Sequence, residues 1–478
     1  MQASWNRFRG NIIGTKAFYK AVMAIIIPVI IQNGVSNVVS MVDNLMVGAL
    51  GNNEMSGVAV ANQLIFIFNL CIFGGLSGPG IFTAQYHGAG DVEGVRYTFR
   101  IKMILGILLS VLCVIVFYFL EDPLLGLYLQ GETDTAAADP VLILQHGKDY
   151  LNLLLISMPA SGIAVAYAST TRETGDAFWP MLASLSAVAV NLFGNWLLIF
   201  GNWGCPALGV KGAAIATVIS RYVEMAINVL HTHLCKHKYP FIRGAYKGFS
   251  IPRQLFGKVL KVGTPLLLNE LLWSIGMSLL NMVYSFCGLI VMGAMSINST
   301  ISNLFSVITY SMGTAEAVMV GADLGAGEFE RAKKHTWQIL SFSIMIAFVT
   351  MIVTLLSYKA VTGLYTGVTE DIRDLAGKLI CISAVGLLIH ATGHICYFAM
   401  RSGGKTFITF LFDCGFTLGV SFPLALLLVK GFHLPIIPTY IIVTASDLLK
   451  SALGFILVKK GVWIQNMAEK KSQTSTVS

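Results

Sequence analysis

A stripe of polar side chains runs along the first long apolar segment, residues 21–48. Its members recur every three or four residues, so they share one face of a helix that is otherwise built largely from Ile, Val, Met and Leu. Asp43 is the one carboxylate in this segment. A carboxylate flanked by amides and hydroxyls could bind a proton or another monovalent cation. The stripe comprises Asn33, Ser36, Asn37, Ser40, Asp43 and Asn44.

An ionised carboxylate in the middle of a bilayer costs roughly 2.5–3.5 kcal/mol on insertion scales, so an acid in such a segment is a functional candidate. Desolvation favours the protonated form of a carboxyl group. A carboxyl that is ionised when open to one face and protonated when open to the other can carry a proton, and an organic cation can compete for the same charge. Asp43 is the first candidate for this chemistry. Its alternative role is a structural hydrogen-bond acceptor for Asn69 or Asn191.

The same pattern occurs a second time, 237 residues further along the chain. Pro28–Asp91 aligns without a gap with Pro265–Glu328, and both stretches end in Gly-Ala-Gly followed by an acid. Such a repeat divides the chain into two halves. The second stripe contains Glu270, a second cation-binding candidate whose alternative role is to pair with a buried basic residue. Its members are Glu270, Ser274, Ser278, Asn281 and Ser285.

The composition indicates an integral membrane protein. Hydrophobic residues make up 55% of the 478 residues, charged residues make up 12%, and the mean hydropathy is +0.73, which excludes an ordinary soluble domain. Apolar runs of roughly 20 residues are long enough to cross a bilayer as helices. Twelve are expected, at 21–48, 55–82, 98–120, 148–170, 178–200, 210–234, 262–287, 293–322, 335–358, 375–398, 406–430 and 436–458.

Six of these segments fall in each half, and because six is even the two halves run parallel, related by a pseudo-twofold axis along the membrane normal. Their polar faces then line one shared space. The sequence predicts an all-α polytopic membrane protein with twelve transmembrane helices in two pseudo-twofold-related six-helix lobes around a central cleft. The expected parts are an interfacial segment at 1–20, an N-lobe at 21–234, a basic linker at 235–261, a C-lobe at 262–458 and a tail at 459–478.

Basic residues predict the orientation. Assigning both termini and every second loop to one face gives that face 24 of the 32 Lys and Arg, which makes it cytoplasmic by the positive-inside rule. Both termini are therefore expected in the cytoplasm, with the chain spanning the inner (plasma) membrane many times. These loops also explain the net charge of +8, so the lipid bilayer is an expected partner and nucleic acid is not.

Other ionisable residues also lie in predicted helices. Glu316 and Asp413 have no basic residue at helical spacing, and both are candidates for cation binding. His390 and His394 share one face of segment 375–398, which predicts a hydrogen-bonding or proton-relay surface or, alternatively, ordinary packing. Two pairs three residues apart are interpreted as intrahelical ion pairs, namely Arg221 with Glu224 and Asp447 with Lys450.

No enzyme or metal site is expected. The eight cysteines are scattered without CxxC or Cys/His spacing, so neither disulfides nor a structural metal site is implied. The two histidines have no HExxH context. Paired aspartates in a GxGD setting and a Ser/His dyad at helical spacing are also missing, so we expect a protein that is not an enzyme.

The paired motifs resemble the MATE family of multidrug and toxic compound extrusion transporters. The resemblance covers nearly the whole chain and rests on the two six-segment halves, on Asp43-x-x-x-Val47-Gly48, and on the two Gly-Ala-Gly-acid loops with basic residues a few positions on. It implies a cation-coupled antiporter, driven by H⁺ or Na⁺ and needing no other cofactor. Such a transporter exports amphipathic, often cationic organic compounds or drugs through a central cleft. A monomer is expected.

The functional acids of that family match this chain unevenly. Asp43 matches the helix 1 aspartate of many members. The helix 5 aspartate of one subgroup falls on Asn195, four residues after the Asn191 that matches its companion asparagine. Glu270 is the candidate for the helix 7 glutamate of another subgroup, although it lies closer to the helix's proline than that pattern has it, and the helix 10 aspartate of that subgroup is absent. The resemblance therefore leaves coupling by H⁺ or by Na⁺ open.

The cation-binding candidates thus include Asn37, Asn44, Asn191, Asn195 and Asn281 besides the acids and histidines. The alternative function is a flippase of lipid-linked saccharides or other lipids, because related families share the two-lobed plan. Those proteins usually add a further helix pair and a more basic cavity, whereas twelve segments with acids on the polar stripes favour a cationic substrate. A channel is also compatible with the polarity, but two near-equal halves suit alternating access better.

Overall fold

The protein is a bundle of long helices in a computed structural model that describes residues 12–129, 139–248, 250–365 and 367–468. Within these ranges eleven single helices are long and apolar enough to cross a membrane, and one bent pair provides a twelfth span. The predicted all-α polytopic fold is confirmed. The spans of the first half are α2 (Lys16–Gly48), α3 (Asn52–Gly88), α4 (Val92–Phe119), the pair α6 (Pro140–Leu155) and α7 (Met158–Glu173), α8 (Phe178–Phe200) and α9 (Val210–Leu234). The spans of the second half are α10 (Arg253–Ser285), α11 (Leu289–Gly325), α12 (Phe329–Gly363), α13 (Glu370–Ser402), a composite span at 406–431 and α16 (Ile436–Lys459). The composite span consists of α14 (Thr406–Phe410), η3 (Leu411–Gly415), η4 (Thr417–Ser421), α15 (Phe422–Leu426) and η5 (Leu427–Gly431).

Several helices differ in their bounds from the sequence expectation. α2 and α10 begin at Lys16 and Arg253, inside the ranges expected for the interfacial segment and the linker. The fourth span is not one straight helix, because α6 and α7 meet at an angle of 51°. Pro159 follows the break and has no N–H to donate to the preceding turn. A short additional helix, α5 (Glu121–Leu129), follows α4.

Each Gly-Ala-Gly-acid motif ends one helix and starts the next. In the first copy, Gly90 takes the left-handed conformation (φ 69°) that glycine adopts readily. Asp91 then caps α4, since its carboxylate accepts a hydrogen bond of 2.9 Å from the N–H of Gly94. In the second copy Gly327 has the same conformation (φ 76°), but Glu328 forms an ion pair of 2.8 Å with Arg331. The motif is therefore a tight helix-to-helix turn in both halves.

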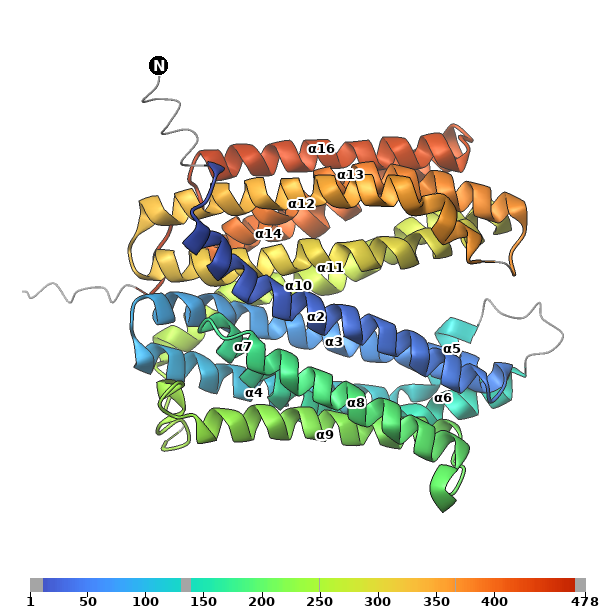
Figure 1. Ribbon diagram of the computed structural model, residues 1–478, viewed down its shortest axis with the longest axis horizontal. Helices are drawn as coiled ribbons and strands as arrows, with labels where there is room; N and C mark the ends of the chain where they lie inside the picture. The colour runs from blue at the N-terminus through green and yellow to red at the C-terminus, as the bar shows by residue number, and fades with distance from the viewer. Residues whose placement is uncertain (1–11, 130–138, 249, 366, 469–478) are drawn as a thin grey trace, which may run out of the picture.

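The two halves of the chain lie side by side (Figure 1). Helices α2 to α9, coloured blue to green, form one side, and helices α10 to α16, coloured yellow-green to red, form the other. Most contacts across the boundary come from the first two helices of each half, because α3 packs against α10 and α11, and α2 packs against α11. The stripe-bearing helices α2 and α10 therefore both border the other half.

A reciprocal contact joins the ends of α3 and α11. A Cβ atom placed on Gly88 would overlap the backbone carbonyl of Ala322, and one placed on Gly325 would overlap the carbonyl of Gln85. Gly88 and Gly325 are related by the 237-residue repeat, and so are Gln85 and Ala322. The sequence repeat is thus a structural pseudo-twofold at this point, where only glycine lets the two backbones meet.

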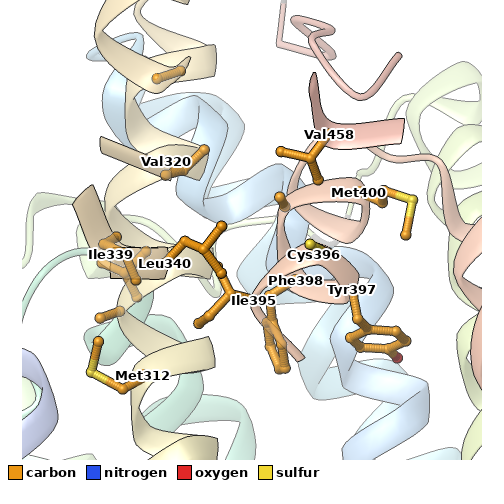
Figure 2. Close-up of a cluster of buried hydrophobic side chains, with 14 of the residues drawn as sticks. Met312, Val320, Ile339, Leu340, Ile395, Cys396, Tyr397, Phe398, Met400 and Val458 are labelled. Atoms are coloured by element: carbon orange, nitrogen blue, oxygen red, sulfur yellow. The ribbon is translucent and has the colours of Figure 1, made fainter. Parts of the chain in front are cut away.

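The packed core of the second half extends to this contact. Figure 2 shows side chains of α13, among them Ile395 and Phe398, facing Ile339 and Leu340 of α12 and Met312 of α11. All of them are buried. The same cluster includes Phe18, Val22, Ile25 and Ile26 of α2, so this core also joins the two halves.

The residues after α16 pack against both halves. The buried amide of Gln85 on α3 donates to the carbonyl of Ser402 (2.8 Å) on α13 and accepts from the N–H of Met467 (2.6 Å). Asn466 donates to the carbonyl of Gly325 (3.1 Å) on α11. The first part of the tail expected at 459–478 is therefore ordered through residue 468 and bridges the halves; the final residues lie outside the described part.

Substituting either glycine of the reciprocal contact tests the pseudo-twofold. Gly88→Ala and Gly325→Ala should each lower stability by about 1–3 kcal/mol or more, because the added methyl group must push two backbones apart. Gly257→Ala is the matched control, since a Cβ on this helical glycine meets nothing within 4 Å. Thermal unfolding of the detergent-solubilised variants measures the effect, and wild-type melting of both Gly88→Ala and Gly325→Ala would contradict the contact.

An acid in the loop between α7 and α8 predicts a pH dependence. Asp176 accepts hydrogen bonds from Lys238 Nζ (2.6 Å) and from the hydroxyl of Tyr239. Burial by itself would raise the pKa of Asp176, but the hydrogen bonds from Lys238 and Tyr239 outweigh it and lower the pKa below its usual value.

Because the folded-state pKa of Asp176 is depressed, its stabilisation is complete above the unfolded-state pKa of about 3.9 and is lost as the pH falls through the folded-state value. Asp176→Asn should therefore melt below the wild type at neutral pH, with a difference that shrinks below about pH 4. Melting curves across the acid range measure this. A difference that stays constant with pH would contradict the assignment.

Candidate functional site

Asp43 on α2 is held by amides from α8. Asn195 Nδ2 donates to its Oδ1 at 2.7 Å. With the Asn191 amide oriented so that its nitrogen faces Asp43, that nitrogen lies 3.0 and 3.1 Å from the two carboxylate oxygens, and its oxygen accepts from Thr217 Oγ1 on α9 at 3.1 Å. Asn191 and Asn195 are four residues apart and therefore point the same way from α8. The structure brings together three residues that the sequence selected, with amide contacts to the carboxylate.

No basic side chain in the described ranges lies within ion-pairing distance of Asp43. Arg221 acts on it electrostatically, but its guanidinium pairs with Glu224 at 3.0 Å. The intrahelical pair expected from the sequence is confirmed there. Asp43 therefore has amide donors but no positive charge at contact distance among the described side chains, which leaves it able to accept a proton or another cation.

Other polar residues of the two stripes are exposed. Asn37 and Asn44 on α2 and Asn281 on α10 are exposed. The C-terminal part of α3, by contrast, is buried at every residue from Gly74 to Gln85. The halves thus pack tightly at the Gly88 and Gly325 end, while polar side chains of α2 and α10 remain uncovered toward the other end.

Glu270 lies at the boundary between the halves. The helices α3 and α10 approach closely here, because a Cβ on Gly74 of α3 would lie 3.1 Å from Glu270 Cγ. Arg401 of α13 and Asp413 both act on Glu270 electrostatically. The guanidinium of Arg401 also lies over the rings of Phe398 and Phe73, 5.0 and 5.4 Å from their centroids, which links the two halves by cation–π contacts.

Asp413 belongs to a second polar cluster, in the second half. Its Oδ1 forms an ion pair of 2.7 Å with Lys450 of α16, and its Oδ2 accepts from Asn269 Nδ2 of α10 at 3.1 Å. The sequence interpretation that Lys450 pairs with Asp447 on its own helix is wrong. Asp447 instead lies 3.6 Å from His390 Nε2. Interhelical packing, rather than spacing along α16, decides which acid Lys450 meets.

The two histidines of α13 have different surroundings. His390 is exposed beside Asp447. His394 stacks against Tyr397 with ring centroids 6.4 Å apart, and Tyr310 of α11 meets it edge-on at 5.0 Å. The hydroxyl of Tyr397 also accepts a hydrogen bond from Asn269 at 3.4 Å. Tyr397 therefore connects His394 to the Asp413 cluster.

Glu316 is separate from the stripes. It is fully buried on α11, where its Oε1 accepts from Thr336 Oγ1 of α12 at 2.7 Å. Its Oε2 has no hydrogen-bond partner in the described part of the chain. This acid faces the interior of the second half rather than the boundary between halves.

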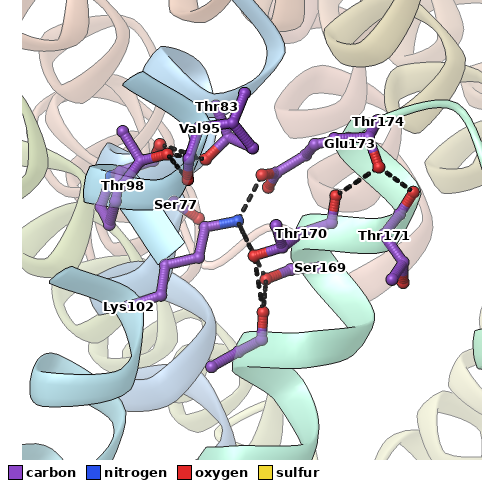
Figure 3. Close-up of polar contacts among 12 residues, drawn as sticks. Ser77, Thr83, Val95, Thr98, Lys102, Ser169, Thr170, Thr171, Glu173 and Thr174 are labelled. Carbon is purple, nitrogen blue, oxygen red and sulfur yellow. Dashed lines mark hydrogen bonds and ion pairs between the residues drawn. The ribbon is translucent and has the colours of Figure 1, made fainter. Parts of the chain in front are cut away.

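A buried ion pair was missed by the sequence reasoning. Lys102 of α4 is completely buried and pairs with Glu173 at the end of α7, while Ser169 and Thr170 also accept from its ammonium at 3.1 and 3.3 Å. Figure 3 shows Lys102 reaching from its helix into this ring of oxygen atoms. The sequence signal for this pair is a lysine inside the predicted span 98–120, but its partner Glu173 lies 71 residues further along the chain.

Two repeated six-span halves, with carboxylates placed between and within them, define a polytopic membrane transporter. The family model described as MatE matches residues 28–197 and 265–427. The chain belongs to this family, the MATE transporters, and is therefore not an enzyme.

Curated relatives cover nearly the whole chain. The "Probable multidrug resistance protein NorM" of Thermotoga maritima is 24% identical over 449 residues, which is 93% of each chain. The "Probable multidrug resistance protein YoeA" of Bacillus subtilis is 23% identical over 428 residues, covering 88% of this chain and 89% of that protein.

Solved structures show the same fold. A structure of MATE in the bent conformation matches with a TM-score of 0.82 at 21% identity, covering 93% of this chain and 95% of the other. An outward-facing conformation of a multidrug resistance MATE transporter of the MOP superfamily matches with a TM-score of 0.80 at 22% identity, with 93% and 95% covered.

The Lys102 pair can be tested by a double substitution. Lys102→Met alone should lower stability by about 3–5 kcal/mol, because it leaves a carboxylate in the protein interior without its partner. Lys102→Met with Glu173→Met should recover most of the loss, since two apolar side chains replace both charges. Denaturation of the purified proteins gives the values. Lys378→Met, which removes an exposed partner of Asp374, is the matched control, and equal effects of both lysine substitutions would contradict the buried pair.

Proposed function

We propose that this protein is a secondary active multidrug efflux transporter that exchanges H⁺ or Na⁺ for amphipathic organic cations or drugs by alternating access. It works as a monomer in the inner (plasma) membrane, with both termini in the cytoplasm. The observation that carries the proposal is the surroundings of Asp43: a carboxylate on the polar stripe that touches amides but no basic residue among the described side chains.

Amide contacts suit a carboxylate that must change its partner. Asn191 and Asn195 can donate hydrogen bonds to the ionised form, and a turned amide offers an oxygen to a metal cation instead. A proton, Na⁺ and an organic cation can therefore each neutralise Asp43 in turn. An ion pair with a fixed lysine or arginine would hold the charge permanently and prevent this exchange.

The packing between halves supports an outward-facing state. With the termini in the cytoplasm, the reciprocal contact of Gly88 and Gly325 and the contacts of Gln85 close the cytoplasmic end. Toward the other end, Met41 and Leu45 of α2 are each 64% exposed. Alternating access then requires the α3 and α11 contact to open while the far ends come together.

The names of the relatives support drugs as substrates, because the two proteins from Thermotoga maritima and Bacillus subtilis are both named as multidrug resistance proteins. The acids on or beside the stripes, Asp43 and Glu270, favour cationic compounds among such substrates. Roles in binding the coupling ion or the substrate are proposed for Asp43, Glu270 and the neighbouring amides.

Everted membrane vesicles test the proposal. A fluorescent cationic drug added outside should discharge a preformed H⁺ or Na⁺ gradient, each imposed separately, and the gradient that responds identifies the coupling ion. Asp43→Asn should abolish the discharge while leaving the amount of protein in the membrane unchanged, because the exchangeable charge is gone.

Asp374→Asn is the control, since this acid is exposed and pairs only within its own helix. Normal discharge by both Asp43→Asn and Glu270→Gln would contradict the site. Drug efflux that continues after both gradients are collapsed would contradict antiport, and transport of a lipid-linked saccharide without drug exchange would support a flippase instead.

A further inference from the structure

The carboxylate of Asp413 has all its close contacts within the second half of the protein. Lys450 Nζ lies 2.7 Å from one oxygen and Asn269 Nδ2 lies 3.1 Å from the other. The side-chain oxygen of Asn269 accepts a hydrogen bond from the N–H of Cys414 at 3.2 Å. This contact fixes the orientation of the Asn269 amide. Both oxygens of Asp413 are therefore held by fixed donors from two other helices and one of these donors is a full positive charge.

The backbone at Asp413 is shaped to make these contacts. The stretches Leu411–Gly415 and Thr417–Ser421 form wide π-type turns instead of α-helix, ahead of Pro423, which cannot donate a backbone hydrogen bond. Wide turns of this kind are frequent at functional positions. Here they present the carboxylate and the neighbouring N–H group of Cys414 toward α10 and α16.

Lys450 occupies a place with the chemistry of an ammonium-binding site. Its ammonium touches the carboxylate and lies 5.5 Å from the centroid of the Phe412 ring, and a carboxylate with an aromatic face is what an alkylammonium ligand requires. Both side chains of the pair remain partly accessible, 19% for Lys450 and 21% for Asp413. The site is therefore not sealed into the core.

The first half has the corresponding base but uses it differently. Arg221 precedes Lys450 by 229 residues, which is the offset that aligns Arg172 with Arg401. Arg221 pairs with Glu224 on its own helix, and Asp43 is left with amide partners. The two halves thus place a base at equivalent positions of their last helices, and only in the second half does it neutralise an acid of another helix.

We propose that Lys450 is a tethered cation that fills the ammonium-binding site of Asp413 in place of a free ion or organic ammonium, so that the second half exchanges no cation at this carboxylate. This inference rests on the proposed antiport function, in which Asp43 exchanges its cation freely. It makes the halves unequal: Asp43 in the first half is open to exchange, and Asp413 in the second half is permanently satisfied.

The other charged groups near the pair do not replace Lys450. Asp447 on α16 faces His390, and Arg401 stacks on two phenylalanine rings near Glu270. His394 faces Tyr397 and Tyr310. Removing the lysine ammonium therefore leaves Asp413 with the Asn269 amide and no cation at contact distance among the described residues.

Binding of n-butylammonium to the purified protein tests the proposal. Lys450→Met should create a saturable site for this probe, seen as a melting temperature that rises with its concentration. Lys450→Met combined with Asp413→Asn should lack the site, with a half-saturating concentration roughly tenfold or more higher, because the charge-assisted contact is missing. Lys450→Arg and the surface control Lys378→Met should behave as the wild type.

A folded Lys450→Met protein that binds n-butylammonium no better than the double variant would overturn the proposal. If Lys450→Met folds only when n-butylammonium or Na⁺ is present, the proposal is supported, because a free cation then replaces the tethered one. If Lys450→Met folds under no condition, transport is measured in proteoliposomes with the double variant Lys450→Met and Asp413→Asn, which has no charge at either position. The ratio of ions to drug exchanged should equal that of the wild type, and a lower ratio would overturn the inference.

The binding measurement does not depend on transport, so it separates this inference from the proposed function. Failure of the wild type to discharge either ion gradient would remove the antiport proposal alone. Failure of Lys450→Met to gain a site would remove the tethered cation alone.

Discussion

Charges inside a membrane protein must be neutralised or reached by water, and this constraint organises the polar interior of the chain. Lys102 meets Glu173 across two helices, with hydroxyl groups completing its shell. Lys450 meets Asp413 in the other half. Against these satisfied pairs, Asp43 stands out because only amides contact it. A charge without a fixed partner is the physical requirement for exchanging one cation for another.

The internal repeat supplies the mechanical frame for that exchange. Gly88 and Gly325 let α3 and α11 touch backbone to backbone at one end. Gly88 meets Ala322 and Gly325 meets Gln85, and the repeat relates these two contacts to each other. Around this contact, side chains also pack across the boundary, because Phe18 and Tyr19 of α2 meet His335 and Phe342 of α12. The segment following α16 adds hydrogen bonds through Gln85, so opening this end must also release polar contacts to the tail.

Duplication has not kept the two halves chemically equal. The bases Arg221 and Lys450 occupy equivalent positions, yet one pairs within its own helix and the other reaches a neighbouring helix. The acids differ as well, since Asp43 lies near the C-terminal end of α2 whereas Asp413 lies in a run of π-type turns close to α16. Two similar halves thus hold one carboxylate that amides contact and one that is paired with a lysine.

The sequence alone determined the twelve spans, the two halves and the polar faces of α2 and α10, because apolar length, a gap-free repeat and helical spacing can all be read along the chain. It also named Asp43, Asn191 and Asn195 as candidates, the two asparagines through the family resemblance. Only the tertiary structure decided the ion-pair partners: Lys450 reaches Asp413, 37 residues away, rather than Asp447. The physical reason is that such pairing depends on how each helix is rotated against its neighbours, and spacing along one helix does not contain that information.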